Sequence, residues 1–524
     1  MYEVAWMWLV AAFVCFIGVS IWGAVCSAGF LEADGCTHYM YARFAVDRHY
    51  LLIDVWGRPL VTAINALPAH FFGRLGVRFT SLAMALVCAI ATYRIAVNQK
   101  YRLPVAAVIF LFAQPLFFLH SFAELTELPF AMVIVLAFWA YQRREFFVMT
   151  VLVAISPVGR PEGFGFVLLA AFALICHRRW WWLLILPVPL MIWSWAGYIN
   201  ARPVGPNGIA IEMHWWQWLI KNWPYEAQSN YGRGPIWWYV AQLPDIVGCL
   251  LVPAALIGGV WCWRNGKLFS PSPGIPREGR GGGGQPVDQS PHPNPPPEYR
   301  ERGQEDHRRR CDFVLAALPY GILLVHSVFW FFGKFSGGEL RYLLVVGPFW
   351  ALTVARGWEW LTRRASAKWS LIAAAVLACL PLSVNWAYTV IPVRYSGDEL
   401  VARQITDWYH GDAEVQKRYP LVMSPQPTFF YMMDKCPAGD EGVAAWSRVQ
   451  VEHAPAGVMM VYEKILATFN SDKKLVIDPD TSLPMGGWVK FREFDIAPGD
   501  TWIIYLSPKD AMGRPTSIDG LTPP

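Results

Sequence analysis

The chain has 524 residues, of which 55% are hydrophobic and only 16% charged, and its mean hydropathy is +0.30. About 25% of the residues of an ordinary soluble protein are charged, so this composition argues against one and indicates many membrane spans. The net charge of +5 requires no nucleic-acid partner, and the ten cysteines show none of the spacings of a zinc or redox site.

The predicted elements begin with an apolar run over residues 5–29, which is too long for the core of a signal peptide and predicts a retained membrane helix. With the runs that follow, we expect about eleven transmembrane helices in an α-helical polytopic membrane protein. The further spans are predicted over 79–97, 105–122, 127–142, 146–159, 163–176, 181–198, 236–263, 313–332, 342–358 and 369–391. Several are shorter than the roughly 20 residues of a full span, which predicts tilted or half-buried helices.

Five short loops between these runs carry paired basic residues. They are Lys100–Arg102, Arg143–Arg144, Arg178–Arg179, Arg264–Lys267 and Arg363–Lys368. Lys and Arg are retained on the cytoplasmic side during insertion, so these loops are predicted to face the cytoplasm. The acids and arginines of the opposite loops then share the far face of the membrane, where they could form an active site.

Residues 30–78 form the first long loop. We place it outside the cytoplasm despite its five arginines, because long loops are less bound by the charge bias and acids are interleaved with the basic residues. The stretch His38–Val46 places apolar groups on one helical face, which predicts a helix lying along the membrane interface.

Two later regions differ in composition from the spans. Residues 268–310 are rich in Pro and Gly and poor in apolar residues, which predicts a disordered cytoplasmic linker. Residues 395–524 are soluble in character, with a helix predicted over 397–410 and strands over 421–424 and 502–506. We therefore expect a small soluble α/β domain, on the same side of the membrane as the acidic loops.

Asp34 lies just past the first span. A carboxylate at the membrane–water boundary could act as a general base on a hydroxyl bound at that surface. The competing interpretation is structural, since Asp34 precedes the predicted interfacial helix and could cap it.

Three further loops place charge beside hydrocarbon. Glu124–Pro129 could bind a substrate or could cap the helix that follows it. Arg160–Gly163 could line a polar cavity, or its Arg and Glu could simply pair with each other. In Glu339–Tyr342 the arginine could hold a phosphate with its fork of donors, or it could snorkel to the interface.

The order of these motifs resembles a known superfamily. The first loop holds Asp34-x-x-x-His38-Tyr39 and leads through Trp56-Gly57-Arg58-Pro59 into the second span. Thr126-Glu127, Arg160-Pro161-Glu162-Gly163 and Arg341-Tyr342 follow. Over about residues 1–390 this pattern resembles the GT-C superfamily of polytopic glycosyltransferases, in particular bacterial enzymes related to the protein O-mannosyltransferase and aminoarabinose-transferase families.

The resemblance implies that residues 1–394 are a transmembrane glycosyltransferase module. Such a module would move a sugar, with inversion, from a polyprenyl-phosphate donor to a hydroxyl of a lipid, glycan or protein acceptor. The active site and the 395–524 domain would lie at the extracytoplasmic face of the cell inner (plasma) membrane. A divalent metal helps some relatives, and nothing in the sequence demands one, so no cofactor is expected to be required and a divalent metal is compatible with the pattern.

The resemblance also implies roles for single residues. Asp34 would take the proton of the acceptor, and Arg341 would hold the departing phosphate. Many relatives have Asp-Glu in the first loop, whereas Gly35 follows Asp34 here, so Glu32 is the alternative base; His38 at the expected interval favours Asp34. The residues expected to bind substrate are Glu32, His38, Arg58, Glu124, Glu127, Arg160, Glu162, Glu339, Arg341 and Tyr342.

Two other classes of protein fit the pattern less well. A transporter or lipid flippase would also gather charged residues in a helical bundle, but its polar residues would line the middle of the spans. A non-catalytic membrane scaffold would need no acid at position 34. An enzyme should lose turnover when Asp34 is replaced, whereas a scaffold should be unaffected.

Overall fold

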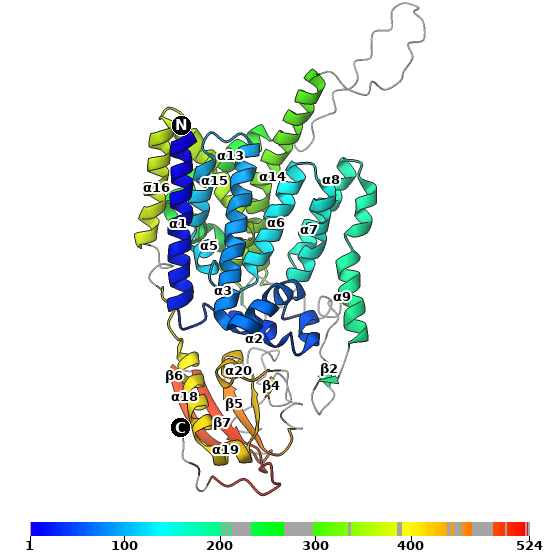
Figure 1. Cartoon of the computed structure of the whole chain (residues 1–524), viewed down its shortest axis with the longest axis vertical. Helices are drawn as coiled ribbons and strands as arrows, with labels where there is room; N and C mark the ends of the chain where they lie inside the picture. Colours follow the sequence, from blue (N-terminus) through cyan, green and yellow to red (C-terminus); the bar gives the residue numbers. More distant parts are fainter. Residues whose placement is uncertain are drawn as a thin grey trace, which may run out of the picture.

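The computed structural model describes most of the chain. The described residues are 2–200, 203–204, 209–210, 232–266, 297–333, 337–384, 390–437, 442–444, 451, 454–463, 486–497, 500–518 and 521. The long helices stand side by side in a bundle, and a smaller domain with a β-sheet lies beyond one end of it (Figure 1). We call the end beside this domain the domain end, and the opposite end, where the N-terminus lies, the basic end.

The helices of the bundle run alternately between these two ends (Figure 1). They are α1 (Tyr2–Cys26), α3 (Pro59–Asn98), α4 (Pro104–Phe112), α5 (Pro115–His120), α6 (Glu127–Gln142), α7 (Phe146–Gly159), α8 (Gly163–Cys176), η2 (Trp180–Ile185), α9 (Val188–Ile199), α11 (Trp238–Ala241), α12 (Leu243–Val247), η3 (Cys249–Leu251), α13 (Val252–Asn265), α14 (Pro297–Phe331), η4 (Leu340–Val346), α15 (Gly347–Leu361) and α16 (Ala367–Val384). Large aromatic side chains fill the core, including Phe110, Phe117, Phe130, Phe349 and Trp350.

Most predicted spans correspond to helices, but four of them are divided: 181–198 into η2 and α9, 342–358 into η4 and α15, and the two that follow. The predicted span 105–122 is divided into α4 and α5, because Pro115 starts a new helix just after the first one ends. The predicted span 236–263 is divided into α11, α12, η3 and α13. Within the described residues, four helices are long and apolar enough to cross a membrane by themselves, so the number of about eleven crossings stays a prediction.

Three of the basic loops end their helices in the same way. Lys100, Arg144 and Arg178 adopt positive φ angles of 56°, 61° and 55° directly after α3, α6 and α8. In each case the next amide donates back to a carbonyl oxygen five residues earlier, as the Tyr101 amide does to Ala96, which closes the helix. A cation there also complements the negative end of the helix dipole.

The basic loops lie together at the basic end. Arg102 Nη1 donates to the carbonyl of Thr362 at 3.1 Å, and Tyr141 Oη lies 3.4 Å from His177 Nε2. The sequence therefore sorted the loops correctly between the two ends of the bundle. Which of the two ends faces the cytoplasm stays a prediction.

The first long loop is largely helical. It contains α2 (Ala33–Phe44) and the 3₁₀ turn η1 (His49–Ile53), and α3 starts at Pro59 rather than near residue 79. Gly73, with φ +60°, kinks α3 where the loop was expected to end. The predicted interfacial helix over His38–Val46 corresponds to α2, which lies between the bundle and the small domain (Figure 1).

The predicted linker over 268–310 is wrong in its last part. Helix α14 starts at Pro297, so 297–310 is helical, while 267–296 lies outside the described residues. His307 explains the difference, because its Nε2 atom lies 3.2 and 3.1 Å from the carbonyl oxygens of Tyr141 and Gln142 at the end of α6. The overall composition of residues 268–310 gives no sign that His307 packs against the end of α6.

The small domain has a mixed five-stranded sheet. Its strands are β3 (Leu421–Ser424), β4 (Gly442–Ala444), β5 (Val458–Glu463), β6 (Val489–Ala497) and β7 (Asp500–Leu506), in the order β4-β3-β5-β7-β6. Strand β3 pairs in parallel with β4 and β5, and β7 pairs antiparallel with β5 and β6. The helices of the small domain are α18 (Gly397–Gly411), α19 (Ala413–Arg418) and α20 (Pro427–Met433). Outside this domain, a short antiparallel pair of strands follows α9: β1 (Pro203–Val204) and β2 (Ile209–Ala210).

The small domain packs directly on α2. Arg43 of α2 forms an ion pair of 2.6 Å with Asp434, which follows α20. Tyr39 and Met40 of α2 belong to the same buried core as Phe429 and Phe430 of α20. The helix that carries the first-loop acids is therefore held by the small domain as well as by the bundle.

Candidate active site

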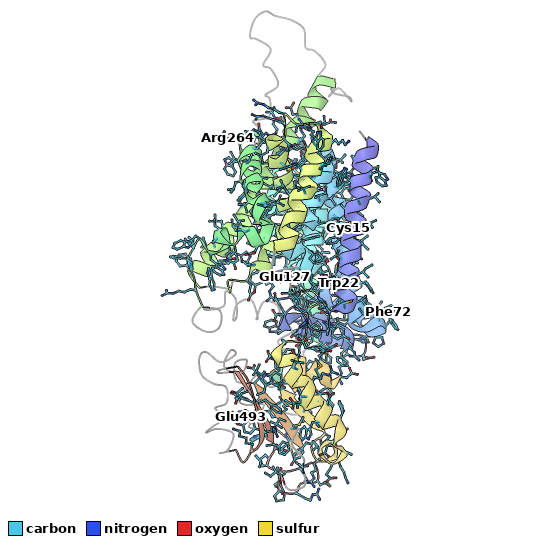
Figure 2. All side chains as sticks on the ribbon, turned by 90° about the vertical axis from the view of Figure 1, so that its left-hand side faces the viewer. Cys15, Trp22, Phe72, Glu127, Arg264 and Glu493 are labelled. Atoms are coloured by element: carbon cyan, nitrogen blue, oxygen red, sulfur yellow. The ribbon has the colours of Figure 1, made fainter. Side chains whose placement is uncertain are left out.

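Arg341 is the centre of an acidic cluster at the domain end. It lies in η4, with its side chain 11% exposed, and its Nη2 atom is 2.6 Å from Asp34 Oδ2. Its Nη1 atom forms an ion pair with Glu32, and its Nε atom lies 3.7 Å from Glu127 Oε1. Figure 2 shows Glu127 at the end of the bundle nearest the small domain, at the level of Trp22 near the end of α1.

The start of α2 supplies the two exposed acids of this cluster. Glu32 is the N-cap residue of α2 and Asp34 lies in its first turn, yet the Glu32 side chain makes no capping hydrogen bond. Both side chains are directed to Arg341 instead, and they are 35% and 44% exposed. The capping interpretation of Asp34 therefore does not describe what its side chain contacts.

Arg160 forms the second half of the cluster. It follows α7, its side chain is 7% exposed, and its Nη1 atom lies 2.6 Å from both Glu127 Oε1 and Thr126 Oγ1. Its Nη2 atom lies 2.7 Å from Glu162 Oε1 at the start of α8. Since Glu127 contacts both arginines, it joins the two halves into what we call the carboxylate–arginine cluster. Its members are Glu32, Asp34, Glu127, Arg160, Glu162 and Arg341.

Tyr342 packs between the two arginines. Its ring centroid lies 5.1 Å from the guanidinium carbon of Arg160 and 5.7 Å from that of Arg341. The ring of His326, on α14, stacks on the ring of Tyr342, with the two centroids 5.3 Å apart and an interplanar angle of 25°. Tyr342 therefore limits how far either arginine can move.

Burial, and to a smaller extent the surrounding charges, set the pKa of Glu32. Burial raises the pKa of Glu32 to about 7, and although Arg341 lowers it, the charges of Glu127, Glu339 and Asp34 raise it again. Burial also raises the pKa of Glu339. Glu32 is therefore the carboxylate of the cluster that takes up a proton near neutral pH.

His38 lies one helical turn after Asp34 on α2. Burial lowers the pKa of His38 to about 4, although the nearby charge of Asp34 raises it, so the imidazole is neutral at neutral pH. Its Nδ1 atom is buried and has no hydrogen-bond partner among the described residues. A neutral ring in this position can accept or donate one hydrogen bond to a bound molecule.

The structure does not bring all of the predicted residues together. Glu124 lies apart from the cluster, because its Oε1 atom accepts hydrogen bonds from Arg74 Nε at 2.7 Å and from Arg78 Nε at 2.8 Å. Arg58, with φ +58°, starts α3, and its charge acts on His38 and Asp54. The substrate-binding prediction for Glu124 thus finds no support in its position.

Sequence reasoning missed two buried histidines. His326 contacts Tyr342 as described, and His120 lies near enough to Glu127 for their charges to interact. The His120 Nδ1 atom is 2.8 Å from the carbonyl oxygen of Leu116, while its Nε2 atom is buried without a hydrogen-bond partner among the described residues. A single histidine in an apolar run gives no spacing signal, so only the fold could identify them.

The described residues offer no metal site. Among them, no three His, Cys, Asp or Glu side chains come together in a way that could hold a metal ion. The expectation that no cofactor is required, with a divalent metal compatible, stays a prediction, and activity after metal depletion would test it.

Comparison with known proteins gives matches in structure only. No family model and no curated protein matches the sequence at a significant level. Two crystal structures of ArnT from Cupriavidus metallidurans are similar in fold. The apo structure matches with a TM-score of 0.58 and 11% identity, and the alignment covers 96% of this chain and 98% of that chain.

The second match is ArnT bound to undecaprenyl phosphate, with a TM-score of 0.55, 12% identity, and coverage of 94% of this chain and 97% of that chain. Identities this low establish a common fold and nothing finer. The coverage includes the small domain as well as the bundle, since almost the whole of each chain is aligned. The chain therefore has the fold of ArnT, and the resemblance predicted from its motifs is confirmed at the level of the fold.

Proposed function

We propose that this protein is a membrane glycosyltransferase that moves a sugar from a polyprenyl-phosphate donor to an acceptor hydroxyl. The contact of Arg341 with two acids of the first loop is the observation that carries the proposal. In this proposal Arg341 binds the donor phosphate, and the candidate base Asp34 lies beside it. The fold supports it, since the similar ArnT was crystallised with undecaprenyl phosphate.

The chemistry requires one base and one fixed cation. Asp34 takes the proton of the acceptor hydroxyl as its oxygen attacks the anomeric carbon of the sugar. The bond between that carbon and the phosphate oxygen breaks, and its electron pair leaves with the polyprenyl phosphate. Arg341 stabilises the charge that develops on this phosphate, and because the phosphate is a good leaving group, no general acid is needed. Attack opposite the leaving group inverts the anomeric carbon.

Without substrate, Arg341 is neutralised by carboxylates. A donor phosphate must therefore replace a carboxylate on the guanidinium, and Glu32 is the one that protonates most readily. Once Glu32 is neutral, it no longer competes with the phosphate for Arg341, and Asp34 remains beside the arginine as the base. Glu127 and Arg160, both almost fully buried, hold the inner side of Arg341 in place.

This exchange predicts a pH dependence of donor binding. The donor is a phosphodiester with constant charge near neutral pH, so the change comes from Glu32, whose pKa is about 7. Below that pH Glu32 is protonated and donor binding is strong; as the pH rises through it, Glu32 ionises and binding weakens. Between about pH 6 and pH 8 the dissociation constant of a non-transferable phosphodiester analogue should rise about tenfold.

Glu32→Gln is the matched variant for this measurement. It should bind the analogue at every pH about as tightly as the parent does at low pH, because the amide cannot ionise. If the affinity of the parent is constant or increases with pH, Glu32 does not compete with the phosphate.

In this proposal the protein spans the inner membrane, and its domain end faces away from the cytoplasm. Glu493, exposed on β6, and Arg264, exposed at the end of α13, lie at opposite ends of the molecule (Figure 2). A membrane-impermeant thiol reagent should label Glu493→Cys in intact cells, whereas it should label Arg264→Cys only after permeabilisation. Labelling of the parent, which has its own cysteines, gives the background to be subtracted. The reverse pattern would overturn the orientation and the placement of the site.

Transfer itself is tested by comparing lipid-linked glycans. Cells with and without this protein should differ in the mass of an extracted glycan or lipid by one sugar residue, and purified protein should restore the difference when given the donor. A transporter would change the distribution of a lipid without adding a sugar to it. Identical glycans in the two cell extracts, together with no transfer by the purified protein, would refute the proposal.

A further inference from the structure

The segment between α1 and α2 determines where the first-loop acids lie. Helix α1 ends at Cys26 and α2 starts at Ala33, so residues 27–31 are the only link between α1 and the two acids, Glu32 and Asp34. This link is too short to absorb a displacement. A contact that fixes it also fixes both acids relative to Arg341.

Two buried arginines of α3 hold the carbonyl groups of this link. Arg78 Nη1 donates to the carbonyl oxygens of Ala24 and Ser27 at 2.7 and 2.8 Å, and its Nη2 atom donates to Gly29 at 3.0 Å. Arg74 donates to the carbonyl oxygens of Ala28, at 2.5 Å, and of Gly29. The last carbonyl groups of a helix have no partner within it, and here the arginines supply one.

Glu124 orients both arginines. Its Oε1 atom accepts a hydrogen bond from the Nε atom of each, and its side chain is 1% exposed, against 11% for Arg74 and 4% for Arg78. We call these three residues the arginine clamp. Buried charges of this kind are tolerated only when they are paired, and the clamp pairs two cations with one carboxylate and several carbonyl dipoles.

The small domain, together with the segment that leads into it, holds the amide groups of the same link. The amides of Ala28 and Gly29 donate to the carbonyl oxygen of Val393 at 2.9 and 3.0 Å, and the amide of Phe30 donates to Glu399 Oε1 at 3.0 Å. Gly29 leaves no room for a side chain, since a Cβ atom there would lie 2.1 Å from the carbonyl oxygen of Arg394. The link is therefore fixed from two sides, by the bundle and by the small domain.

We infer that the arginine clamp and Glu399 are positioning residues, which set the first-loop acids against Arg341 through the backbone of residues 27–30. This inference rests on the proposed function. None of the four side chains has a described contact with Arg341, so none is a catalytic residue. It also gives the small domain a part in the active site, because Glu399 lies in α18 of that domain.

Glu399 has a matched control within its own capping box. Glu399 accepts from the Ser396 amide at 2.8 Å, and the Glu399 amide donates to Ser396 Oγ at 3.2 Å, so Glu399→Ala and Ser396→Ala each remove one half of the cap of α18. Only Glu399→Ala also removes the bond to Phe30. On the bundle side, Arg74→Lys keeps a charge beside Glu124 but replaces a fork of donors with a single ammonium group.

Transfer kinetics and hydrogen exchange together test the inference. Glu399→Ala and Arg74→Lys should each lower kcat about 10- to 100-fold, since a small misplacement of a reacting group costs this much. Binding of the non-transferable phosphodiester should change less than about threefold, because Arg341 is intact. Backbone amides of residues 27–34 should exchange at least about tenfold faster in both variants and at the parent rate in Ser396→Ala.

Each result has a distinct meaning. Parent-like kcat and exchange in both variants would overturn the inference, and so would an equal loss in Ser396→Ala, which would assign the effect to the stability of α18. If the parent transfers no sugar at all, the proposed function fails, and the exchange measurement, which needs no substrate, still decides whether these residues fix the link.

Discussion

Asp34→Asn is expected to lower the rate of sugar transfer by roughly two to four orders of magnitude, the usual value of general-base catalysis. Asparagine keeps the size of the side chain and an oxygen that can accept the hydrogen bond from Arg341, which Asp34 accepts at 2.6 Å. It cannot take the proton of the acceptor. Donor binding should therefore survive, and single-turnover kinetics with a saturating donor would show the loss in the transfer step.

Asp47→Asn is the control for this measurement. Asp47 lies in the same first loop, but its side chain is 63% exposed and its Oδ2 atom lies 3.9 Å from His70 Nδ1, away from Arg341. Asp47→Asn should transfer sugar at the parent rate. If Asp34→Asn also does so, Asp34 is not the base, and Glu32→Gln becomes the variant to measure.

Arg341→Lys is expected to weaken binding of the non-transferable donor analogue about 10- to 100-fold and to slow transfer as well. A hydrogen bond to a charged group contributes about 1.5–3 kcal/mol, and a lysine offers the phosphate one ammonium in place of a fork. The phosphate is contacted both in the bound donor and, with more charge, as it leaves, so both measurements should change. Arg341→Ala should weaken binding of the analogue and slow transfer more than Arg341→Lys does.

Arg356→Lys is a matched control at the other end of the bundle. Arg356 is also almost buried and also contacts two acids, Asp312 at 3.4 Å and Glu359 at 3.3 Å. Its substitution should leave donor affinity unchanged. Removing Arg341 leaves Glu32 and Asp34 without their cation, while Glu127 keeps Arg160, and unfolding of the variant would also abolish binding, so the elution profile of Arg341→Ala in detergent must match that of the parent. Parent-like affinity in a folded Arg341→Ala would exclude Arg341 as the phosphate ligand.

The pattern of charged residues in the sequence predicted where the site lies, but it did not predict which residues of the site contact one another. Asp34 and Arg341 are 307 positions apart, and only the alternation of basic loops along the chain indicated that they share one end of the bundle. Hydrophobicity and basic residues set the direction of each helix, so this part of the fold can be deduced without coordinates. The pairing of Arg341 with Glu32 and Asp34 together depends on helix rotations that these patterns do not determine.

The differences between expectation and structure at Glu124 and at residues 297–310 have the same origin, because both depend on contacts between distant parts of the chain. Glu124 and Glu127 are three residues apart in one loop, yet the first belongs to the arginine clamp and the second to the carboxylate–arginine cluster. Their spacing offers no reason to separate them, because the connection 123–126 has no regular secondary structure and tertiary packing sets its course. In the same way, the helical extent of 297–310 depends on His307 finding the end of α6.

The bond between Phe30 and Glu399 joins positions 369 residues apart, which has a consequence for biosynthesis. Both first-loop acids are made early, while the residue that fixes their backbone emerges from the ribosome only after the last membrane helix. A nascent chain that has inserted every helix holds the link through the arginine clamp alone and still lacks the contact from Glu399. Full competence for sugar transfer is therefore expected to appear only when the last quarter of the chain has been made and has folded at the domain end, so an incomplete chain should consume lipid-linked sugar slowly.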